Sequence, residues 1–288
     1  MKSLDLATLD LSDPLVFAST TAVFFAMVMF RYVLVVGAFF GVCWLWRPTC
    51  TERRQIYRTL PGMKQWRQEF FWSVMTSLQF AVIGVVTLWL WQRGHTAIYT
   101  DWAAYGTTYA ILSMVIYSLI HETYFYWMHR AIHHPKLFHR LHRIHHLSVR
   151  PSPWAAFSFN PSEAFLEALI VPILLLMIPM HPIVLIAYLS LMTLSSVINH
   201  LGFELYPKGT ATNPIGKWFI GATHHSQHHR FSHCNFGLYF TFWDHLCGTQ
   251  HSGYVDNFAK VTSSMIATPR SQQPPDSRRS TTTPRMQS

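Results

Sequence analysis

Residues 104–134 read AYGTTYAILSMVIYSLIHETYFYWMHRAIHH, an apolar run that ends in a cluster of histidines. The part from Ala104 to Tyr126 is long enough to cross the hydrocarbon core of a bilayer as a helix. His129 and His133 follow at positions i and i+4, so a helix through them carries both imidazoles on one face. The stretch therefore predicts a membrane span that ends at one membrane surface with two histidines on one helix face.

Two more apolar stretches precede this one, at residues 14–46 and 70–91. The first is too long for one upright helix and too short for two, so we expect one tilted span. It contains Arg31, which should face the helix bundle or extend to a lipid headgroup, because a charge facing lipid is costly. The alternative is that the span starts after Arg31 and that the preceding residues lie at the interface.

A further apolar stretch, residues 164–199, is interrupted by Pro179, His181 and Pro182, which predict a turn between two helical arms. Each arm has roughly 17 residues and a length of ~25 Å, so the arms either cross the membrane or only dip into it. In total we expect an all-α integral membrane protein with about four to five transmembrane or re-entrant helices.

The composition agrees with a membrane protein. The chain has 288 residues, of which 50% are hydrophobic and 12% charged, whereas about a quarter of the residues in a soluble domain are charged. Its net charge of +9 is carried mainly by Lys and Arg beside the apolar runs, which suits anionic lipid headgroups better than nucleic acid. We therefore expect a membrane, and no nucleic acid, as a partner.

The basic residues also predict the topology. Residues 47–68 carry six Lys or Arg and should be cytoplasmic, whereas residues 92–102 carry a single arginine and should lie on the opposite side. With the spans above, every histidine cluster then lies in a helical cap on the cytoplasmic side. The sequence shows no cleavable signal peptide.

The chain is expected to form one membrane-embedded domain, residues 1–266, followed by a disordered tail. Residues 267–288 are rich in Ser, Thr, Pro, Gln and Arg and have almost no apolar side chains that could join a core. The cysteines form no C-x-x-C pair and predict no disulfide framework; they are Cys43, Cys50, Cys234 and Cys247.

Three histidine clusters share one spacing. The pair in residues 121–134 is followed by HRLHRIHH at 139–146 and THHSQHH at 223–229, which hold histidines at i, i+3 and i+4. A single histidine on an apolar helix is more often a packed residue than a ligand, but eight at this spacing would leave many buried polar atoms without partners in the absence of metal. Eight ligands exceed what one ion accepts, so the pattern predicts a dinuclear site, although imidazole alone does not distinguish iron from zinc, copper or nickel.

Together with other motifs, these clusters resemble the fatty acid hydroxylase and sterol desaturase superfamily. The resemblance extends over residues 118–250 and is carried, in order, by FYWMHRAIHH, LHRIHH, SFNPSEAFLEA, NHLGFE and TFWDHLCGT. It implies two iron ions and dioxygen as cosubstrate. Zinc is expected as a substitute in purified protein, because such sites bind zinc more tightly than ferrous iron. The implied ligands are His129, His133, His142, His145, His146, His200, His225, His228 and His229.

The remaining histidines are not assigned as ligands. His121 stays unassigned, and His134 and His224 are neighbours of the clusters, whereas His139, His233, His245 and His251 are expected at the surface or in supporting positions. Metal-bound imidazoles usually donate their second N–H to a carboxylate or carbonyl. The candidate partners are Glu122, Glu163, Asn199 and Asp244. Each of the three acidic residues is equally compatible with a helix cap or an ion pair with a nearby arginine.

The resemblance implies a membrane oxidoreductase that hydroxylates or desaturates a sterol, fatty acyl or related lipid taken from the bilayer. Because no nucleotide-binding fingerprint is present, electrons should come from a separate cytochrome b5, ferredoxin or reductase. The membrane would be a bacterial inner membrane or the endoplasmic reticulum.

Two other classes of protein share part of this pattern. A histidine-rich membrane metal transporter or metal-storage protein remains an alternative, although its ligands should lie along a path within the spans. An intramembrane zinc protease is disfavoured, because Phe125 stands where an H-E-x-x-H motif starting at His121 requires its second histidine.

Overall fold

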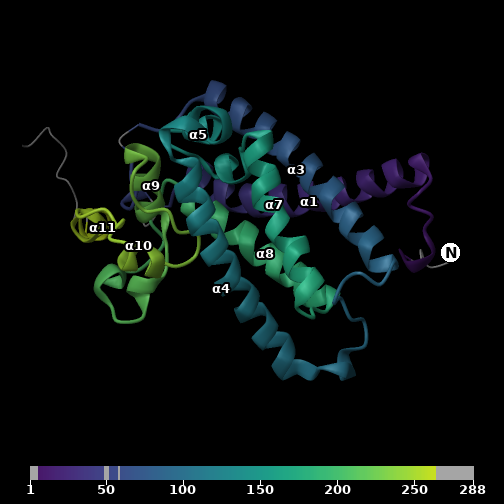
Figure 1. Cartoon of the computed structure of the whole chain (residues 1–288). Helices are drawn as coiled ribbons and strands as arrows, with labels where there is room; N and C mark the ends of the chain where they lie inside the picture. The colour runs from purple at the N-terminus through teal and green to yellow at the C-terminus, as the bar shows by residue number, and fades with distance from the viewer. Residues whose placement is uncertain (1–5, 49–51, 58, 264–288) are drawn as a thin grey trace, which may run out of the picture.

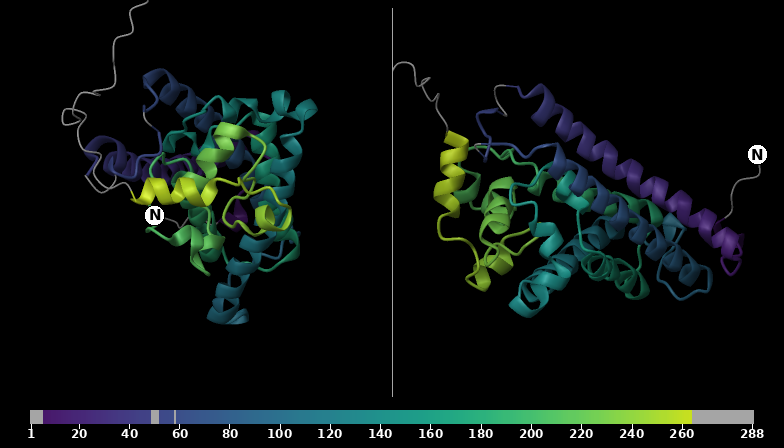
Figure 2. Two further views of the ribbon diagram at one scale, coloured as in Figure 1. Left: turned by 90° about the vertical axis from the view of Figure 1, so that its left-hand side faces the viewer. Right: turned by 90° about the horizontal axis from the view of Figure 1, so that it is seen from above.

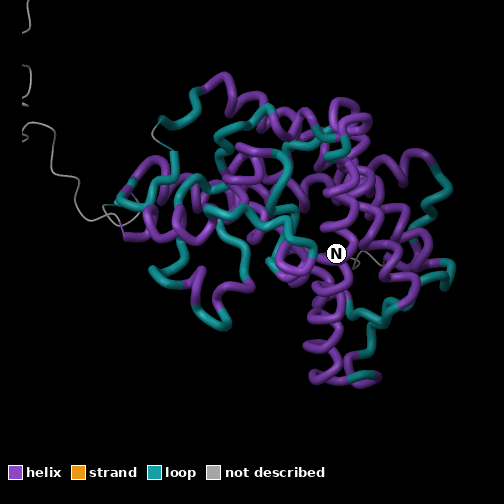
Figure 3. Tube along the Cα trace, turned by 60° about the vertical axis from the view of Figure 1, so that its left-hand side comes forward, coloured by secondary structure: helices purple, strands orange, loops and turns teal. Residues whose placement is uncertain are grey.

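The computed structural model describes residues 6–48, 52–57 and 59–263. In this part the chain forms helices joined by loops and turns, with no strand among the named elements (Figures 1 and 3). The predicted tail, residues 267–288, lies outside the described residues. The long helices are α1 (Pro14–Phe40), α3 (Met63–Gln92), α4 (Gly106–Ile132), α7 (Pro161–Met177) and α8 (Pro182–Asn199). The shorter α-helices are α5 (Pro135–Leu141), α6 (Arg143–His146), α9 (Ala222–Phe231), α10 (Phe242–Leu246) and α11 (Tyr254–Ser263). A π-helix, η2 (Gly41–Trp46), continues α1, and 3₁₀ turns lie at η1 (Leu6–Thr8), η3 (Trp102–Ala104), η4 (Pro153–Phe157), η5 (Thr210–Thr212) and η6 (Gly216–Trp218).

Three helices are long and apolar enough to cross a membrane: Pro14–Trp46, Met63–Gln92 and Pro182–Asn199. The first is one unbroken helix, as expected of a single long segment. The point at which it enters the membrane stays a prediction, and so does the alternative that the span starts after Arg31. The turn predicted in the last apolar stretch is also present, between α7 and α8. α4 and α7 do not combine the length and hydropathy of the other three, and α7 has only 17 residues. The total number of complete spans therefore stays a prediction.

Several helices begin with the same local signal, a capping side chain followed by proline. Asp13 accepts hydrogen bonds from the backbone of Leu15 (2.7 Å) and Val16 (3.2 Å) ahead of α1, and Asn160 caps α7 in the same way. Histidines do this for α5 and α8, where Nδ1 of His134 and of His181 accepts from a first-turn N–H. A proline at the first helical position loses no hydrogen bond, so these caps define where each helix starts.

The helices form a bundle with its histidine-bearing elements at one end. α1 packs along α3, and α3 in turn contacts η4 and α7; the views in Figure 2 show α1 running along one side of the molecule. α9, α10 and α11 lie at the end opposite to the α3–α4 connection (Figure 1). Buried side chains such as Tyr117, Leu175 and Tyr188 fill the space between α4, α7 and α8. The bundle thus provides a fixed frame for the loops and short helices at one end.

Candidate metal centre

Four segments bring the nine predicted ligands together. His129 is on the last turn of α4 and His133 follows it; His200 directly follows α8. The second cluster lies at and within α6, and the third lies on α9. Eight of the nine side chains are at most 8% exposed, and His133 is partly buried. Residues far apart in the sequence are therefore concentrated in one buried volume.

The nine rings form two groups, within each of which the candidate ligand nitrogens lie within 4.8 Å of one another. One group contains His129, His133, His142, His146 and His228, and the other contains His145, His200, His225 and His229. The two groups share no residue, and the second cluster contributes to both. This arrangement agrees with the prediction of two metal positions, and no further histidine joins either group among the described residues.

The closest contacts within the groups join one Nε2 atom to another. The distance is 3.1 Å from His129 to His142 and 3.0 Å from His146 to His228 in the first group. In the second group it is 3.2 Å from His145 to His200 and 3.0 Å from His200 to His225. Two nitrogen ligands that each lie ~2.1 Å from the same ion, with a right angle between the two bonds, are ~3.0 Å apart. The spacing is therefore that of neighbouring ligands around one ion.

The second ring nitrogen shows which atom carries the proton. Nδ1 of His129 lies 2.8 Å from the carbonyl oxygen of Phe236, and Nδ1 of His200 lies 2.7 Å from that of Ser196. Nδ1 of His145 likewise faces the carbonyl oxygen of Ser158 at 3.3 Å. Because a carbonyl only accepts, Nδ1 is the protonated nitrogen and Nε2 keeps its lone pair in a neutral ring.

Two bare lone pairs therefore face each other where Nε2 of His145 meets Nε2 of His200. Such a pair forms no hydrogen bond and is repulsive unless a cation lies between the two nitrogens. Nε2 of His129 and Nε2 of His142 also face each other, and Nδ1 of His142 lies 2.5 Å from the carboxyl group of Glu163. The residues thus fit a pair of metal ions by their protonation as well as by their spacing.

Burial keeps these rings neutral. Desolvation, followed by repulsion from neighbouring histidines, lowers the pKa of His225, His228 and His229 well below its ordinary value. For His146 the same two causes lower the pKa to about 3. Neutral imidazole is the form that binds metal, so the fold itself prepares the ligand state at neutral pH.

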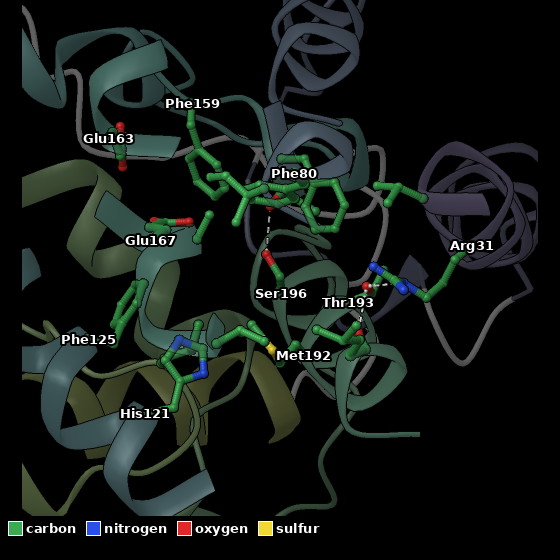
Figure 4. Close-up of a pocket in the computed structure, with 18 of the residues that line it drawn as sticks. Arg31, Phe80, His121, Phe125, Phe159, Glu163, Glu167, Met192, Thr193 and Ser196 are labelled. Atoms are coloured by element: carbon green, nitrogen blue, oxygen red, sulfur yellow. Dashed lines mark hydrogen bonds between the residues drawn. The ribbon is translucent and has the colours of Figure 1, made fainter. Parts of the chain in front are cut away.

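A cavity of about 240 Å³ extends from the histidines into the bundle. Its lining comes mainly from apolar side chains of α1, α3, α4, α7 and α8, including Phe80 and Met192, together with Phe159 between η4 and α7 (Figure 4). It is also lined by members of both histidine groups: His129, His142, His145, His200 and His225. An apolar molecule in this cavity would therefore contact both candidate metal positions.

The four residues predicted to orient the metal-binding histidines have different roles. Only Glu163 contacts a cluster histidine directly. Glu122 instead accepts hydrogen bonds from the backbone of Leu238 and Tyr239, and Asp244 accepts from Phe236 and Gly237. Asn199 donates to the carbonyl of Leu238. For these three residues the expectation was wrong: they fix the 234–240 loop, whose main-chain oxygens accept from the histidines.

The other histidines are accounted for by different contacts. Nδ1 of His121 is within 3.0 Å of the hydroxyls of Tyr188 and Tyr239, and its ring lines the cavity, a position that the sequence left unassigned. His134 caps α5 and is exposed. His224 is buried outside both groups, with Nε2 3.8 Å from Asp244. His139, His233 and His245 are exposed and His251 is partly exposed, as expected of surface or supporting residues.

The fold and this site define a helical membrane-type protein with a candidate centre for two metal ions. The fatty acid hydroxylase family model matches residues 114–249, the region that holds every histidine of both groups. The chain is 30% identical to lathosterol oxidase of Rattus norvegicus over 206 residues, 66% of this chain and 67% of the relative. The chain belongs to the fatty acid hydroxylase family.

Other relatives are similar over shorter regions. Lathosterol oxidase of Homo sapiens is 30% identical over 188 residues, 64% of this chain and 61% of the relative. A Delta(7)-sterol 5(6)-desaturase of Gibberella zeae is 28% identical over 164 residues, 56% of this chain and 48% of the relative. The chain thus spans about half to two thirds of the length of these relatives. No solved structure matches the chain significantly.

Proposed function

We propose that this protein is a membrane-bound oxidoreductase that uses two iron ions and dioxygen to hydroxylate or desaturate a lipid. The observation that carries the proposal is the cavity, because its apolar walls meet both groups of unprotonated Nε2 atoms. Bound iron would supply the oxidation of an unactivated C–H bond by dioxygen. The two groups would hold the ions through the nine histidines named above.

The chain's own residues have three tasks in this function. The Nδ1 protons of His129, His200 and their neighbours are held by main-chain oxygens, which keeps each ring in one orientation. Glu163 does the same for His142 with a carboxylate. The apolar side chains of the cavity exclude water and hold a hydrocarbon segment against the histidines. The substrate is thereby positioned before any chemistry takes place.

A sterol is the first substrate to test, because the relatives are a lathosterol oxidase and a Delta(7)-sterol 5(6)-desaturase. Fatty acyl and other lipids are the further candidates. We propose a separate cytochrome b5, ferredoxin or reductase as electron donor. The exposed cations Lys136, Arg140 and Arg143 on α5 and α6 give this donor a basic surface close to the histidines.

The proposal is tested by metal analysis together with turnover. Purified protein reconstituted with ferrous iron should hold about two ions per chain and convert a membrane lipid in the presence of oxygen and an electron donor. His145→Ala and His228→Ala, one in each group, should abolish turnover and lower the iron content while the protein stays in the membrane. Zinc acquired during expression is removed first, because it binds such sites more tightly than ferrous iron.

His134→Ala is the matched control, since this exposed histidine caps α5 and joins neither group. It should retain iron and turnover. Loss of both in His134→Ala would contradict the division into ligands and bystanders. Full turnover in both His145→Ala and His228→Ala would refute the di-iron enzyme.

A further inference from the structure

Arg31 is a charged side chain near the middle of the 33-residue helical span formed by α1 and η2. Its Nε donates a hydrogen bond to Oγ1 of Thr193 on α8 (3.1 Å), and both side chains line the cavity (Figure 4). The hydroxyl of Thr193 donates in turn to the carbonyl of Leu189 at 2.9 Å. Arg31 is therefore held at the cavity wall by a neutral partner.

The guanidinium has no counter-charge in the described part of the chain. No carboxylate there forms an ion pair with Arg31, and its two terminal nitrogens have no hydrogen-bond partner among these residues. Glu163 and Glu167 also line the cavity, but they lie at the other end from Arg31 (Figure 4). An unpaired charge within a membrane-spanning helix is costly, and such residues in membrane proteins usually serve a substrate or ion.

We propose that Arg31 binds an oxyanion, a carboxylate or a phosphate or sulfate ester, at the polar end of the lipid that occupies the cavity. Thr193 engages Nε and leaves the terminal nitrogens free, and paired N–H groups of arginine match the two oxygens of such an anion. A lipid with only an uncharged hydroxyl at this end would leave the positive charge of Arg31 uncompensated. The lipid would lie with its anionic end at Arg31 and its hydrocarbon part extending toward the histidines. This proposal rests on the proposed function in one respect only, namely that the lipid bound by Arg31 is also the substrate.

Binding to the iron-loaded full-length protein in neutral detergent tests this directly, with three probes of equal chain length. Hexadecanoate and hexadecyl phosphate carry the oxyanion, and hexadecanol is the neutral control. We expect both anions to bind at least about tenfold more tightly than the alcohol, and Arg31→Met to remove this difference while binding of the alcohol is unchanged. The two anions distinguish a carboxylate from a phosphate headgroup. Equal affinity of the wild-type protein for all three probes, or an unchanged preference in Arg31→Met, would overturn the proposal.

Cholesterol sulfate and cholesterol form a second matched pair for a ring skeleton. Tighter binding of the sulfate, again lost in Arg31→Met, supports the proposal for a sterol lipid. A preference for cholesterol over every anion in the wild-type protein contradicts it. Because these are binding measurements, they are independent of turnover: an inactive protein that still prefers anions would refute the proposed function and leave the role of Arg31 intact.

Thermal unfolding separates binding from a purely structural role. Without lipid, Arg31→Met should melt at the same temperature as the wild-type protein or higher, because an unpaired charge has been removed. Hexadecanoate should raise the melting temperature of the wild-type protein and of Arg31→Lys by more than it raises that of Arg31→Met. If Arg31→Met melts lower without lipid and keeps its full shift with hexadecanoate, Arg31 is a structural residue and the proposal is wrong.

Discussion

Among the described residues, Glu163 is the one carboxylate that contacts a candidate ligand, so its substitution isolates the effect of a supporting group. Glu163→Leu removes the acceptor for Nδ1 of His142, and we expect a ten- to hundredfold loss of metal affinity, the usual effect of losing such a partner. Glu163→Gln retains an acceptor oxygen and should lose less. Competition with a chelator measures both, and Ser162→Ala, an exposed neighbour, is the control. Equal metal affinity in Glu163→Leu and Ser162→Ala would contradict this role.

At the level of single residues, the sequence predicted the candidate ligands better than their supports. Spacing on helices places pairs such as His225 and His229 on one face whatever the tertiary fold, and family motifs supplied His200. The partners are mostly main-chain oxygens, for instance those of Phe236 and Ser196, which leave no mark in a sequence. This is why Glu122 and Asp244 were misread: each stabilises the loop that presents such oxygens and does not contact a cluster histidine itself.

Among the elements, α9 depends on one buried carboxylate at its start. Glu204 accepts hydrogen bonds from the backbone of Thr223 (2.9 Å) and Tyr206 (3.0 Å). Glu204→Leu should lower the free energy of unfolding by about 1–2 kcal/mol, as for loss of a helix cap, and should weaken metal binding because α9 carries three candidate ligands. Thermal unfolding and metal content measure the two effects. Glu52→Gln, an exposed carboxylate, should change neither, and a Glu204→Leu protein that keeps wild-type stability would contradict the capping role.

The long helices were predictable because apolar runs and proline positions are local signals. The turn between α7 and α8 follows from Pro179 and Pro182, and the continuity of α1 follows from the length of its apolar run. The short elements were not predictable in the same way. α11 packs on α9, with Tyr254 edge-on to the ring of His224, a contact between distant segments that no local pattern indicates.

For the whole molecule, the topology can be tested by labelling. Figure 1 shows the α3–α4 connection, which contains Thr96, at the end of the bundle opposite to α5 and α9. In a cysteine-free background, Thr96→Cys and Arg143→Cys should therefore react with a membrane-impermeant reagent from opposite sides, with Arg143→Cys on the cytoplasmic side. The loop around Arg58 is predicted on that side too, although Arg58 lies outside the described residues. Labelling of both cysteines from one side would refute this topology.

Stability of the metal-free protein should fall in acid. The folded state keeps His225, His228 and His229 neutral because burial lowers their pKa, whereas in the unfolded chain they take up protons near the ordinary value of 6.5. The unfolded state then binds more protons, so the free energy of unfolding decreases as pH drops below about 6.5. Melting temperatures between about pH 8 and about pH 5 measure this dependence. A melting temperature that is constant or rises toward acid would contradict it.

The hydrogen bonds on the far side of the rings make the two histidine groups unequal. In the first group only His133 lacks an Nδ1 partner, whereas in the second both His225 and His229 lack one. Such partners raise the basicity of a ligand, and the first group also has one more ring. We therefore expect the ions to load in sequence, with the five-histidine position filled first. At one equivalent of iron most chains would be half-loaded and inactive, so turnover plotted against added iron should show a lag and rise steeply with the second equivalent.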